Sequence, residues 1–555
     1  MEHPPEETMF SKQEETDSIN PQLLLVIVAT LLCLLPFIGK PFNIDEPLFI
    51  WAARHIRSNP FDFYGFNVNW YGTEASAAEI IKNPPLASYY LAAAASLGGW
   101  SEVSLHLAFL LPAVAAIAGT FLLGRELSLH PLPAALLTLL TPVFVVSSAT
   151  VMCDTMMLAF YVWAVYLWIR GMKRDSYGRL FLASVLVGLC SLTKYFGMSL
   201  IPLLLLYTLC SKGGRRRNAL FLLAPFLMLL AYQLWTKGLY GKGLLLDAAD
   251  YANSAKSHSP AGLLASLITG LSFLGGCFIP TLFFAPVLWS RRVLLAGLAA
   301  VPLFAFALSL LPFPKLPVAV SWTYYLEMSL YVVAGLHLFA VAVAFLRENR
   351  EPESLLLFFW VAGTFVFAAF VNWSVNGRSM LPMAPAVGLI VARMLSSKWE
   401  GLDDMAVLRS RGLLIPLGLA LSISMAVAWS DYTLADTARD AAQRITRSYG
   451  ARTSLTFQGH WGFQYYMEQK GAVAWDPGKS FAAPVAMAVP ENNTNMDSGV
   501  VGRGVLIEMI QISPAQYLST MNSKVRAGFY SSVRGALPYA FCEVPDERYI
   551  VVELP

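Results

Sequence analysis

The sequence predicts a polytopic α-helical membrane protein with a small C-terminal α/β domain outside the cytoplasm. Of the 555 residues, 56% are hydrophobic and only 14% are charged, and the mean hydropathy is +0.55. A soluble domain carries roughly 25% charged residues, so this composition excludes a soluble enzyme. Long apolar runs recur along most of the chain, and a helix needs about 20 mainly apolar residues to cross a bilayer.

The apolar runs and their breaks predict about 13 membrane-spanning helices. They cover residues 21–39, 103–123, 131–150, 152–170, 179–194, 196–210, 218–237, 261–288, 293–311, 327–346, 354–371, 379–396 and 413–430. A further stretch at 84–99 is apolar but follows Pro84 and Pro85, and it could be a helix that dips into the membrane. No internal repeat and no coiled-coil heptad is visible.

The lysines and arginines of the short loops predict the orientation. Sixteen of them fall in loops on the same side as the N-terminus, and the short loops on the other side carry only scattered ones. Because basic residues are enriched in cytoplasmic loops, the N-terminus is predicted to be cytoplasmic. Residues 1–20 then form an acidic cytoplasmic tail, and since they lack the features of a secretory signal, the first span is expected to remain as an anchor.

This orientation also predicts the domain organisation. Residues 21–430 form the transmembrane domain, and both its first outer loop, 40–100, and the C-terminal part, 431–555, lie outside the cytoplasm. The C-terminal part regains polar residues, and its length is that of a small α/β domain. Its β-like runs are Thr453–Phe457, Val505–Ile512 and Tyr549–Glu553, and its helix-like stretches are Tyr432–Arg447 and Trp461–Gln469.

Charge and cysteine content limit the possible partners. A formal charge of +3 and a pI near 8.4, without a basic helix interleaved with aromatic residues, exclude nucleic acid as a partner. Five of the six cysteines lie in or beside apolar spans, and their spacing is not typical of a disulfide framework or a zinc site. The partners expected from this composition are membrane lipids.

Two adjacent carboxylates, Asp45 and Glu46, follow directly on the first span. Acidic side chains at the boundary between lipid and water are costly to desolvate, which favours a functional role. The alternative is a helix start, because Asp is a good N-cap and acidic residues favour the first helical turn. The sequence alone leaves both interpretations open.

Four more charged residues accompany them on the predicted outer side. Lys82 precedes a Pro-Pro turn, which in the alternative interpretation only begins a helix. Asp154 opens a span, Lys194 interrupts two short apolar runs, and Arg378 precedes a late span. The alternatives are that Asp154 is wetted by the interface, that Lys194 snorkels and that Arg378 is an interfacial anchor. Carboxylates and cations from different spans could instead converge in one site.

Such a site suits the transfer of a group from a lipid phosphate to a hydroxyl. A carboxylate must orient the weakly nucleophilic hydroxyl and take its proton. Lysine and arginine would stabilise the charge that develops on the phosphate leaving group. Nucleotide sugars are absent outside the cytoplasm, so a sugar donor would have to be carried on a membrane lipid.

These motifs, in this order, resemble those of the polyprenyl-phosphate-dependent glycosyltransferases of the GT-C fold, especially the protein O-mannosyltransferases and the aminoarabinose transferases that modify lipid A. The resemblance covers about residues 20–400. It implies a GT-C fold in the bacterial inner membrane, and inverting transfer of a sugar from a polyprenyl-phosphate donor to a glycan, lipid or protein acceptor. The motifs are Asp45-Glu46, Lys82–Leu86 with Tyr89-Tyr90, Asp154, Thr193-Lys194, and Arg378 with Leu381, Pro382 and Pro385.

The resemblance also implies residue roles. Asp45 matches the acid that acts as base or orients the acceptor, Glu46 is its companion, and Asp154 matches the second acid across the cavity. The positions that match cations near the donor phosphate are Lys82, Lys194 and Arg378, although Asn83 separates Lys82 from the Pro-Pro turn. Tyr89 and Tyr90 are expected to contact acceptor or lipid. A divalent metal could bind the carboxylates, but nothing in the sequence requires a cofactor.

The segment Phe457–Met467 resembles tails attached to some bacterial members of the group. His460 is expected to be structural, because no second histidine or cysteine accompanies it at ligand spacing. A further hypothesis is that Trp461, Tyr465 and Tyr466 form a platform for a carbohydrate or acceptor.

The main alternative function is a transporter or flippase of lipid-linked glycans, which would also be polytopic and carry charges in the membrane. Transporters usually place such charges near the midplane on broken helices and contain two repeated halves. Here the charges gather at the outer ends of the spans. A non-catalytic scaffold would leave the carboxylate pair unexplained.

Overall fold

The computed structural model describes residues 20–127, 129–211, 215–256, 259–310, 322–396, 398–399, 401–450, 455–479 and 485–554. The predicted cytoplasmic tail, apart from Asn20, lies outside these residues. Within the described ranges, nine helices are long and apolar enough to cross a membrane, and the bent pair α6 (Pro131–Leu139) and α7 (Pro142–Ser148) could supply a tenth. The prediction of a polytopic helical membrane protein is therefore confirmed, whereas the number of 13 spans is not.

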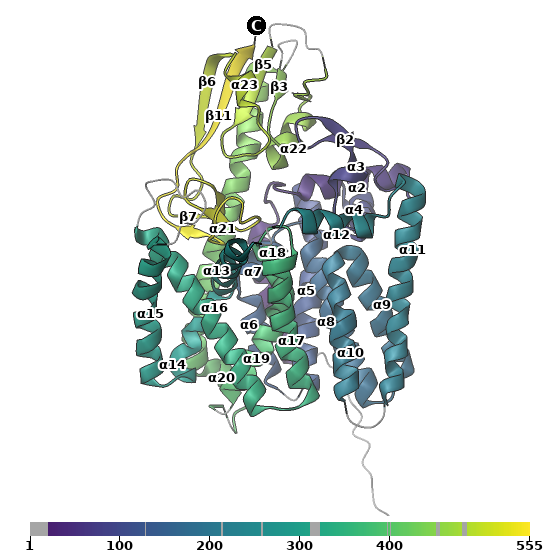
Figure 1. Ribbon diagram of the computed structural model, residues 1–555, viewed down its shortest axis with the longest axis vertical. Coiled ribbons are helices and arrows are strands. Elements are labelled where there is room, and N and C mark those ends of the chain that lie inside the picture. Colours follow the sequence, from purple (N-terminus) through teal and green to yellow (C-terminus); the bar gives the residue numbers. More distant parts are fainter. Residues whose placement is uncertain are drawn as a thin grey trace, which may run out of the picture.

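The long helices run side by side as one bundle (Figure 1). The principal ones are α5 (Glu102–Glu126), α8 (Cys153–Lys173), α11 (Leu223–Tyr240), α13 (Pro260–Cys277), α15 (Arg291–Leu310), α16 (Trp322–Glu348), α17 (Pro352–Val366), α19 (Ala384–Ser396) and α21 (Arg411–Tyr449). Shorter apolar helices complete it: α1 (Pro21–Leu34), α9 (Tyr177–Thr193) and α10 (Leu200–Cys210). Peripheral α15 leaves Leu298 71% and Leu303 69% exposed, as expected for side chains that face lipid.

Glycines allow a close helix contact in the bundle, between α13 and α16. A Cβ atom on Gly275 would lie 1.8 Å from the backbone oxygen of Tyr331, and one on Gly335 would lie 2.5 Å from that of Leu271. Any larger residue at either position would force the helices apart. Small residues at membrane-helix interfaces commonly serve this close backbone approach.

The first outer loop forms a layer over one end of the bundle (Figure 1). It contains α2 (Glu46–Ser58), a hairpin of β1 (Asn67–Asn69) and β2 (Glu74–Ser76), α3 (Ala77–Ile80) and α4 (Leu86–Gly98). The apolar stretch predicted at 84–99 corresponds to α4, which begins directly after Pro85. The amphipathic α12 (Leu244–Ser254) lies in the same layer. Polar loop elements thus cover the end of the bundle at which the predicted site residues lie.

The C-terminal domain stands on this layer and is joined to the bundle by the 39-residue helix α21. The predicted boundary at 430/431 falls inside this helix, which has no break there. The main sheet has the order β4-β3-β5-β11-β6, with β3 parallel to β4 and β5, and β11 antiparallel to β5 and β6. Its strands are β3 (Leu455–Phe457), β4 (Val473–Ala474), β5 (Val485–Pro490), β6 (Val505–Ile512) and β11 (Glu547–Leu554).

The β strands and two helices confirm the small α/β domain that the sequence predicts. Helix α22 (Trp461–Gln469) connects β3 to β4, and the short α23 (Ser498–Val501) precedes β6. The predicted β-like run at Thr453–Phe457 corresponds to β3, and residues 453 and 454 lie outside the described ranges. The predicted helix at Tyr432–Arg447 is the outer half of α21.

Candidate active site

A line of ion pairs joins four of the predicted site residues at the end of the bundle that the first outer loop covers. Arg378 Nη2 lies 2.8 Å from Asp45 Oδ2, and Arg378 Nη1 lies 3.8 Å from Asp154 Oδ2. The other carboxylate oxygen of Asp154 lies 2.5 Å from Lys194 Nζ. The sequence places these residues up to 333 positions apart, and the fold brings them together as alternating acids and bases.

Each of the four side chains is positioned by a helix end. Asp45 precedes α2, but its side chain makes no capping hydrogen bond, so the helix-cap alternative does not account for it. Asp154 lies in the first turn of α8, and Lys194 follows the last residue of α9, where the backbone becomes extended. Arg378 lies in the short helix α18 (Gly377–Met380), whose start is fixed by the side chain of Asn376 accepting from Ser379 N at 2.8 Å.

The four side chains differ in their access to solvent. The Asp45 side chain is 29% exposed, whereas that of Asp154 is fully buried. In the described part of the chain, Asp154 Oδ2 and Arg378 Nε make no hydrogen bond. Asp45 is therefore the carboxylate that an external molecule can reach, and Asp154 is the buried counter-ion of Lys194 and Arg378.

Glu46 lies next to Asp45 in sequence but has different surroundings. Its carboxylate accepts hydrogen bonds from Asn43 N at 2.6 Å and from Val151 N at 2.8 Å, and the residue is fully buried. Burial raises the pKa of Glu46 to about 7, although the nearby Lys40 and the two backbone donors act in the opposite direction. These contacts hold the first outer loop against the segment before α8, outside the line of ion pairs.

A second charged group surrounds Lys82, at the same end of the bundle. Asp247 Oδ2 lies 2.5 Å from Lys82 Nζ, and Asp247 Oδ1 lies 2.9 Å from Lys242 Nζ. Two cations share one acid here, so the group carries a net positive charge. The side chains of Lys82 and Lys242 are 24% and 37% exposed. An anion can therefore approach this group from outside.

Tyr251 connects the two charged groups. Asp247 and Tyr251 lie four residues apart on α12 and so share one face of that helix. Lys82 Nζ lies 5.6 Å from the centre of the Tyr251 ring. Partial burial raises the pKa of Tyr251, and the nearby charge of Asp45 raises it further. Burial, Tyr251 and Asp45 likewise raise the pKa of Tyr71 to about 12.

The aromatic residues Tyr89 and Tyr90 are tied to backbone atoms of the first outer loop and of α5. The hydroxyl of Tyr89 donates to Pro60 O, and that of Tyr90 donates to Ala108 O at 2.6 Å. Both side chains remain half-buried. In this structure they anchor α4 to its neighbours.

The predicted platform of Trp461, Tyr465 and Tyr466 is wrong, because the structure buries its two tyrosines. Tyr465 and Tyr466 are 1% and 5% exposed. Tyr466 accepts from Phe42 N at 2.9 Å and donates to Glu102 at 2.8 Å, so this pair docks the C-terminal domain on the bundle. Aromatic residues on a helix face are attractive as a sugar platform, but this face of α22 is packed against the first outer loop.

The surroundings of His460 fit the structural role that is expected for it from the sequence. Burial lowers its pKa to about 3, and a ring nitrogen lies 2.9 Å from Thr494 Oγ1. Among the described residues, no group of three or more His, Cys, Asp or Glu could hold a metal ion. The Arg378 guanidinium contacts both Asp45 and Asp154, so these two carboxylates do not fit a divalent ion between them.

Several residues near the site were not singled out by sequence reasoning. Tyr71 lies in the first outer loop, and Lys242, Asp247 and Tyr251 lie in the polar segment 237–259 between two apolar spans, but no local pattern marks any of them. The signal available for the three residues of 237–259 is the density of charged and aromatic residues in that segment.

A family model described as dolichyl-phosphate-mannose-protein mannosyltransferase matches residues 82–235. This match confirms the predicted resemblance over that part of the chain. It includes three of the charged residues described above, Lys82, Asp154 and Lys194. No curated protein sequence matches the chain.

Solved structures of membrane glycosyltransferases are also similar to the chain. The oligosaccharyltransferase of Archaeoglobus fulgidus is 14% identical over 82% of this chain and 62% of its own, with a TM-score of 0.47. ArnT from Cupriavidus metallidurans, solved with undecaprenyl phosphate, is 16% identical over 97% of this chain and 98% of its own, with a TM-score of 0.46. The protein O-mannosyltransferase Pmt1-Pmt2 complex of S. cerevisiae is 19% identical over 40% and 35%, with a TM-score of 0.31.

Proposed function

We propose that this protein is an integral-membrane glycosyltransferase that moves a sugar from a polyprenyl-phosphate donor to an acceptor hydroxyl on the extracytoplasmic face, with inversion at the anomeric carbon. One observation carries the proposal: Asp45 is a partly exposed carboxylate held at 2.8 Å by Arg378, at the outer end of a helix bundle. The match of residues 82–235 to a family named for a dolichyl-phosphate-linked donor supports the donor class.

In the proposed reaction, Asp45 orients the acceptor hydroxyl and takes its proton. The hydroxyl oxygen forms a bond to the anomeric carbon while the bond from that carbon to the phosphate oxygen breaks. The electron pair of the broken bond leaves with the polyprenyl phosphate. One displacement with one base inverts the anomeric centre, whereas retention would require a covalent intermediate on a second carboxylate.

Arg378, Asp154 and Lys194 position the base rather than replace it. Asp154 is fully buried between the two cations, so it fixes the Arg378 guanidinium that in turn holds Asp45. The four charges sum to zero, and the developing phosphate charge would therefore be met by a group with excess positive charge. Lys82 and Lys242 around Asp247 form such a group, and we assign the donor phosphate to them.

The proposed location follows from the orientation predicted by the basic loops. The protein crosses the plasma membrane several times, with its N-terminus in the cytoplasm and its C-terminal domain outside. The donor enters from the lipid, and the acceptor, which is a glycan, lipid or protein, approaches from the extracytoplasmic side.

The proposal is tested by supplying radiolabelled polyprenyl-phosphate sugars to the purified protein with a hydroxyl acceptor mixture from the cell envelope. Wild type is expected to transfer label. Asp45→Asn, which cannot accept the proton, is expected to lose about 10²–10⁴-fold in rate, the range typical of a general base. Asp250→Asn is the matched control, because Asp250 is an exposed acid on α12, and it should retain wild-type transfer.

Two results would contradict the proposal. Transfer that survives in Asp45→Asn would remove Asp45 as the base. Absence of transfer from every donor, combined with movement of a lipid-linked glycan across vesicles that contain the protein, would replace the enzyme by a transporter.

A further inference from the structure

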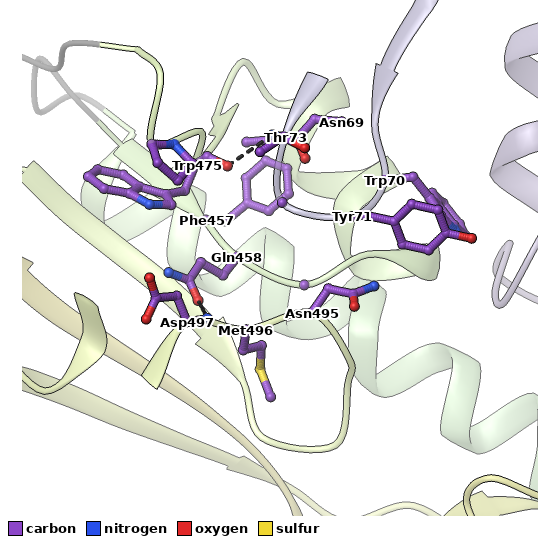
Figure 2. A pocket seen from close by; sticks show the side chains of 14 residues that line it. Asn69, Trp70, Tyr71, Thr73, Phe457, Gln458, Trp475, Asn495, Met496 and Asp497 are labelled. Atoms are coloured by element: carbon purple, nitrogen blue, oxygen red, sulfur yellow. Dashed lines mark hydrogen bonds between the residues drawn. The ribbon is translucent and has the colours of Figure 1, made fainter. Parts of the chain in front are cut away.

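A pocket lies between the C-terminal domain and the hairpin of the first outer loop (Figure 2). Its volume is about 270 Å³, which is large enough for a sugar ring. The hairpin supplies Asn69 to Thr73, and the domain supplies the segments that follow β3, β4 and β5. It is separate from the line of ion pairs, and none of the charged residues assigned to the reaction lines it.

The topology of the sheet explains why a pocket forms there. Strands β3, β4 and β5 are parallel, and their order is β4-β3-β5, so the chain passes from β3 to β4 on one side and then crosses to β5 on the other side of β3. In open sheets with parallel strands, ligands bind at the carboxyl ends of the strands where the order reverses. Gln458 and Gly459 directly follow β3, Trp475 directly follows β4, and Asn495 lies in the loop after β5. All of them line the pocket.

Gln458 offers an unused hydrogen-bond donor in this pocket. Its Oε1 accepts from Asp497 N at 2.8 Å, which fixes the orientation of the amide. Its Nε2 has no hydrogen-bond partner among the described residues, although the residue is only 6% exposed. A buried donor without a partner costs free energy, and a ligand oxygen would satisfy it.

The remaining lining residues favour an uncharged ligand with hydroxyl groups. None of the 14 described residues that line the pocket is Lys or Arg, which disfavours a phosphate or another anion. The acid among them, Asp497, accepts hydrogen bonds from Gly499 N at 2.8 Å and Val500 N at 3.2 Å. Aromatic side chains at its wall, such as Trp475 and Phe457, provide flat apolar surface (Figure 2). Asn69, Asn495 and Thr73 add amide and hydroxyl groups. Aromatic surface combined with neutral polar groups matches the apolar and hydroxylated faces of a sugar.

The pocket is held in shape by contacts that cross from the hairpin to the domain. Asn69 Nδ2 donates to Trp475 O at 2.9 Å, and Glu74 N donates to Asp476 Oδ2 at 3.1 Å. The rings of Trp70 and His460 lie 4.6 Å apart. A preformed site avoids part of the entropy cost of binding.

The hairpin also leads from the pocket toward Asp45. Figure 2 shows the Tyr71 side chain on the side of the hairpin loop away from Trp475 and Gln458. That side chain is near enough to Asp45 for the carboxylate charge to raise its pKa. Tyr71 therefore lines the pocket and also lies near the proposed base.

We propose that this pocket binds an uncharged saccharide unit of the acceptor. Its identity as part of the acceptor rests on the proposed glycosyltransferase function, whereas its capacity to bind a neutral saccharide does not. The hydroxyl that reacts belongs to a part of the acceptor farther along the chain, beside Asp45.

The experiment measures binding without a donor, by saturation-transfer NMR on the full-length protein in detergent. The probes are the methyl glycosides of glucose, galactose, mannose and N-acetylglucosamine, with glucose 6-phosphate as the charged comparison. At least one neutral glycoside is expected to bind more tightly than glucose 6-phosphate. Gln458→Glu retains the acceptor atom for Asp497 N and removes the free donor, and it should weaken binding about tenfold.

Two further variants keep the test decisive. Asn495→Gly removes a lining amide where the backbone already has a positive φ of 58°, so it preserves the loop and should also weaken binding. Gln511→Glu makes the same chemical change on the exposed strand β6, and it should bind like wild type. Binding that is absent in wild type, or unchanged in both Gln458→Glu and Asn495→Gly, would overturn the inference.

The transfer assay separates this inference from the proposed function. Saccharide binding without transfer from any donor would support the pocket and contradict the glycosyltransferase. Transfer without saccharide binding would support the glycosyltransferase and contradict the pocket as a saccharide site.

Discussion

Asp45 and Glu46 are neighbours in sequence, yet they belong to two different regions of the molecule. Asp45 is partly exposed and held by Arg378 in the line of ion pairs. Glu46 is fully buried, and both of its carboxylate oxygens accept backbone hydrogen bonds. It lies with the buried pair of Lys40 and Asp431, whose charges act on its pKa. The first region is open to a reactant, and the second fixes the loop that carries it.

The difference shows that charged side chains near the membrane boundary have two separate roles. In the line of ion pairs, the Asp45 carboxylate stays accessible, and its charge is balanced by the neighbouring charged side chains. In the buried region, the Asp431 carboxylate has three partners: it accepts from Lys40 at 2.5 Å, from Tyr530 at 2.7 Å and from Thr520 at 2.9 Å. Changes in the first region should alter catalysis, and changes in the second should alter stability.

The largest effect on stability is expected for Lys40→Met. The side chains of Lys40 and Asp431 are 1% and 2% exposed, so the substitution leaves a buried carboxylate without its cation. Removing one partner of such a pair typically costs about 3–5 kcal/mol. Unfolding of the purified protein in detergent should show a loss of this size.

The matched control is Lys524→Met, which removes the cation of an exposed pair with Glu491 at 3.3 Å. Exposed pairs contribute about 1 kcal/mol or less, so its stability should stay close to wild type. A similar loss in both variants would mean that the buried region is not special, and the comparison between the two regions would fail.

The sequence was sufficient for most of the helical architecture, because burial in lipid imposes long apolar runs. The predicted span at 152–170 is α8, and that at 379–396 corresponds to α18 and α19 together. The number of spans was not confirmed, because the predicted spans at 21–39, 179–194 and 196–210 correspond to apolar helices of only 10–17 residues, and because length alone does not reveal a bend. The run at 131–150 reads as one span, but Pro142 starts a new helix and the pair α6 and α7 bends by 66°.

The sequence predicted site residues only where a charged side chain stands in apolar surroundings, in which a charge is costly. Asp154 and Lys194 stand out for this reason, and the fold pairs them with each other. The partner of Lys82 was not predictable, because Asp247 lies 165 residues away in a polar segment. Apart from the family resemblance, the sequence could not separate Asp45 from Glu46, since their difference arises from the backbone turn and from distant Val151.

A smaller effect on stability is expected from the titration of Glu46. Burial raises its pKa from 4.5 to about 7, so the folded protein keeps this proton at a pH where the unfolded chain has lost it. The contribution to stability is present in full below pH 4.5 and is lost as the pH rises through 7. At about 1.4 kcal/mol for each pKa unit, the loss is about 3 kcal/mol.

Glu46→Gln removes this titration, and its stability should fall less than that of wild type between pH 5 and pH 8. Glu79→Gln changes an exposed acid on α3 of the same loop and should retain the wild-type pH dependence. Equal pH dependence in wild type and Glu46→Gln would show that Glu46 does not titrate in this range and would contradict the prediction.

The smallest effect concerns Lys82, and it separates donor binding from both stability and the chemical step. Lys82→Gln leaves Lys242 and Asp247 as a neutral pair, so the attraction for the donor phosphate falls. The Lys82 side chain is 24% exposed, and solvent and salt screen its charge. We therefore expect the KM for the donor to rise about threefold to tenfold with little change in kcat, which corresponds to about 1 kcal/mol.

Asp247→Asn changes the same group of side chains and should shift the KM for the donor in the opposite direction. It removes the acid shared by Lys82 and Lys242, so the local positive charge rises and the donor KM should fall. Both changes in KM should diminish at high salt, because screening weakens an interaction between accessible charges. If neither variant changes KM while Arg378→Lys raises it, the donor phosphate binds in the line of ion pairs, and that region provides both the base and the anion site.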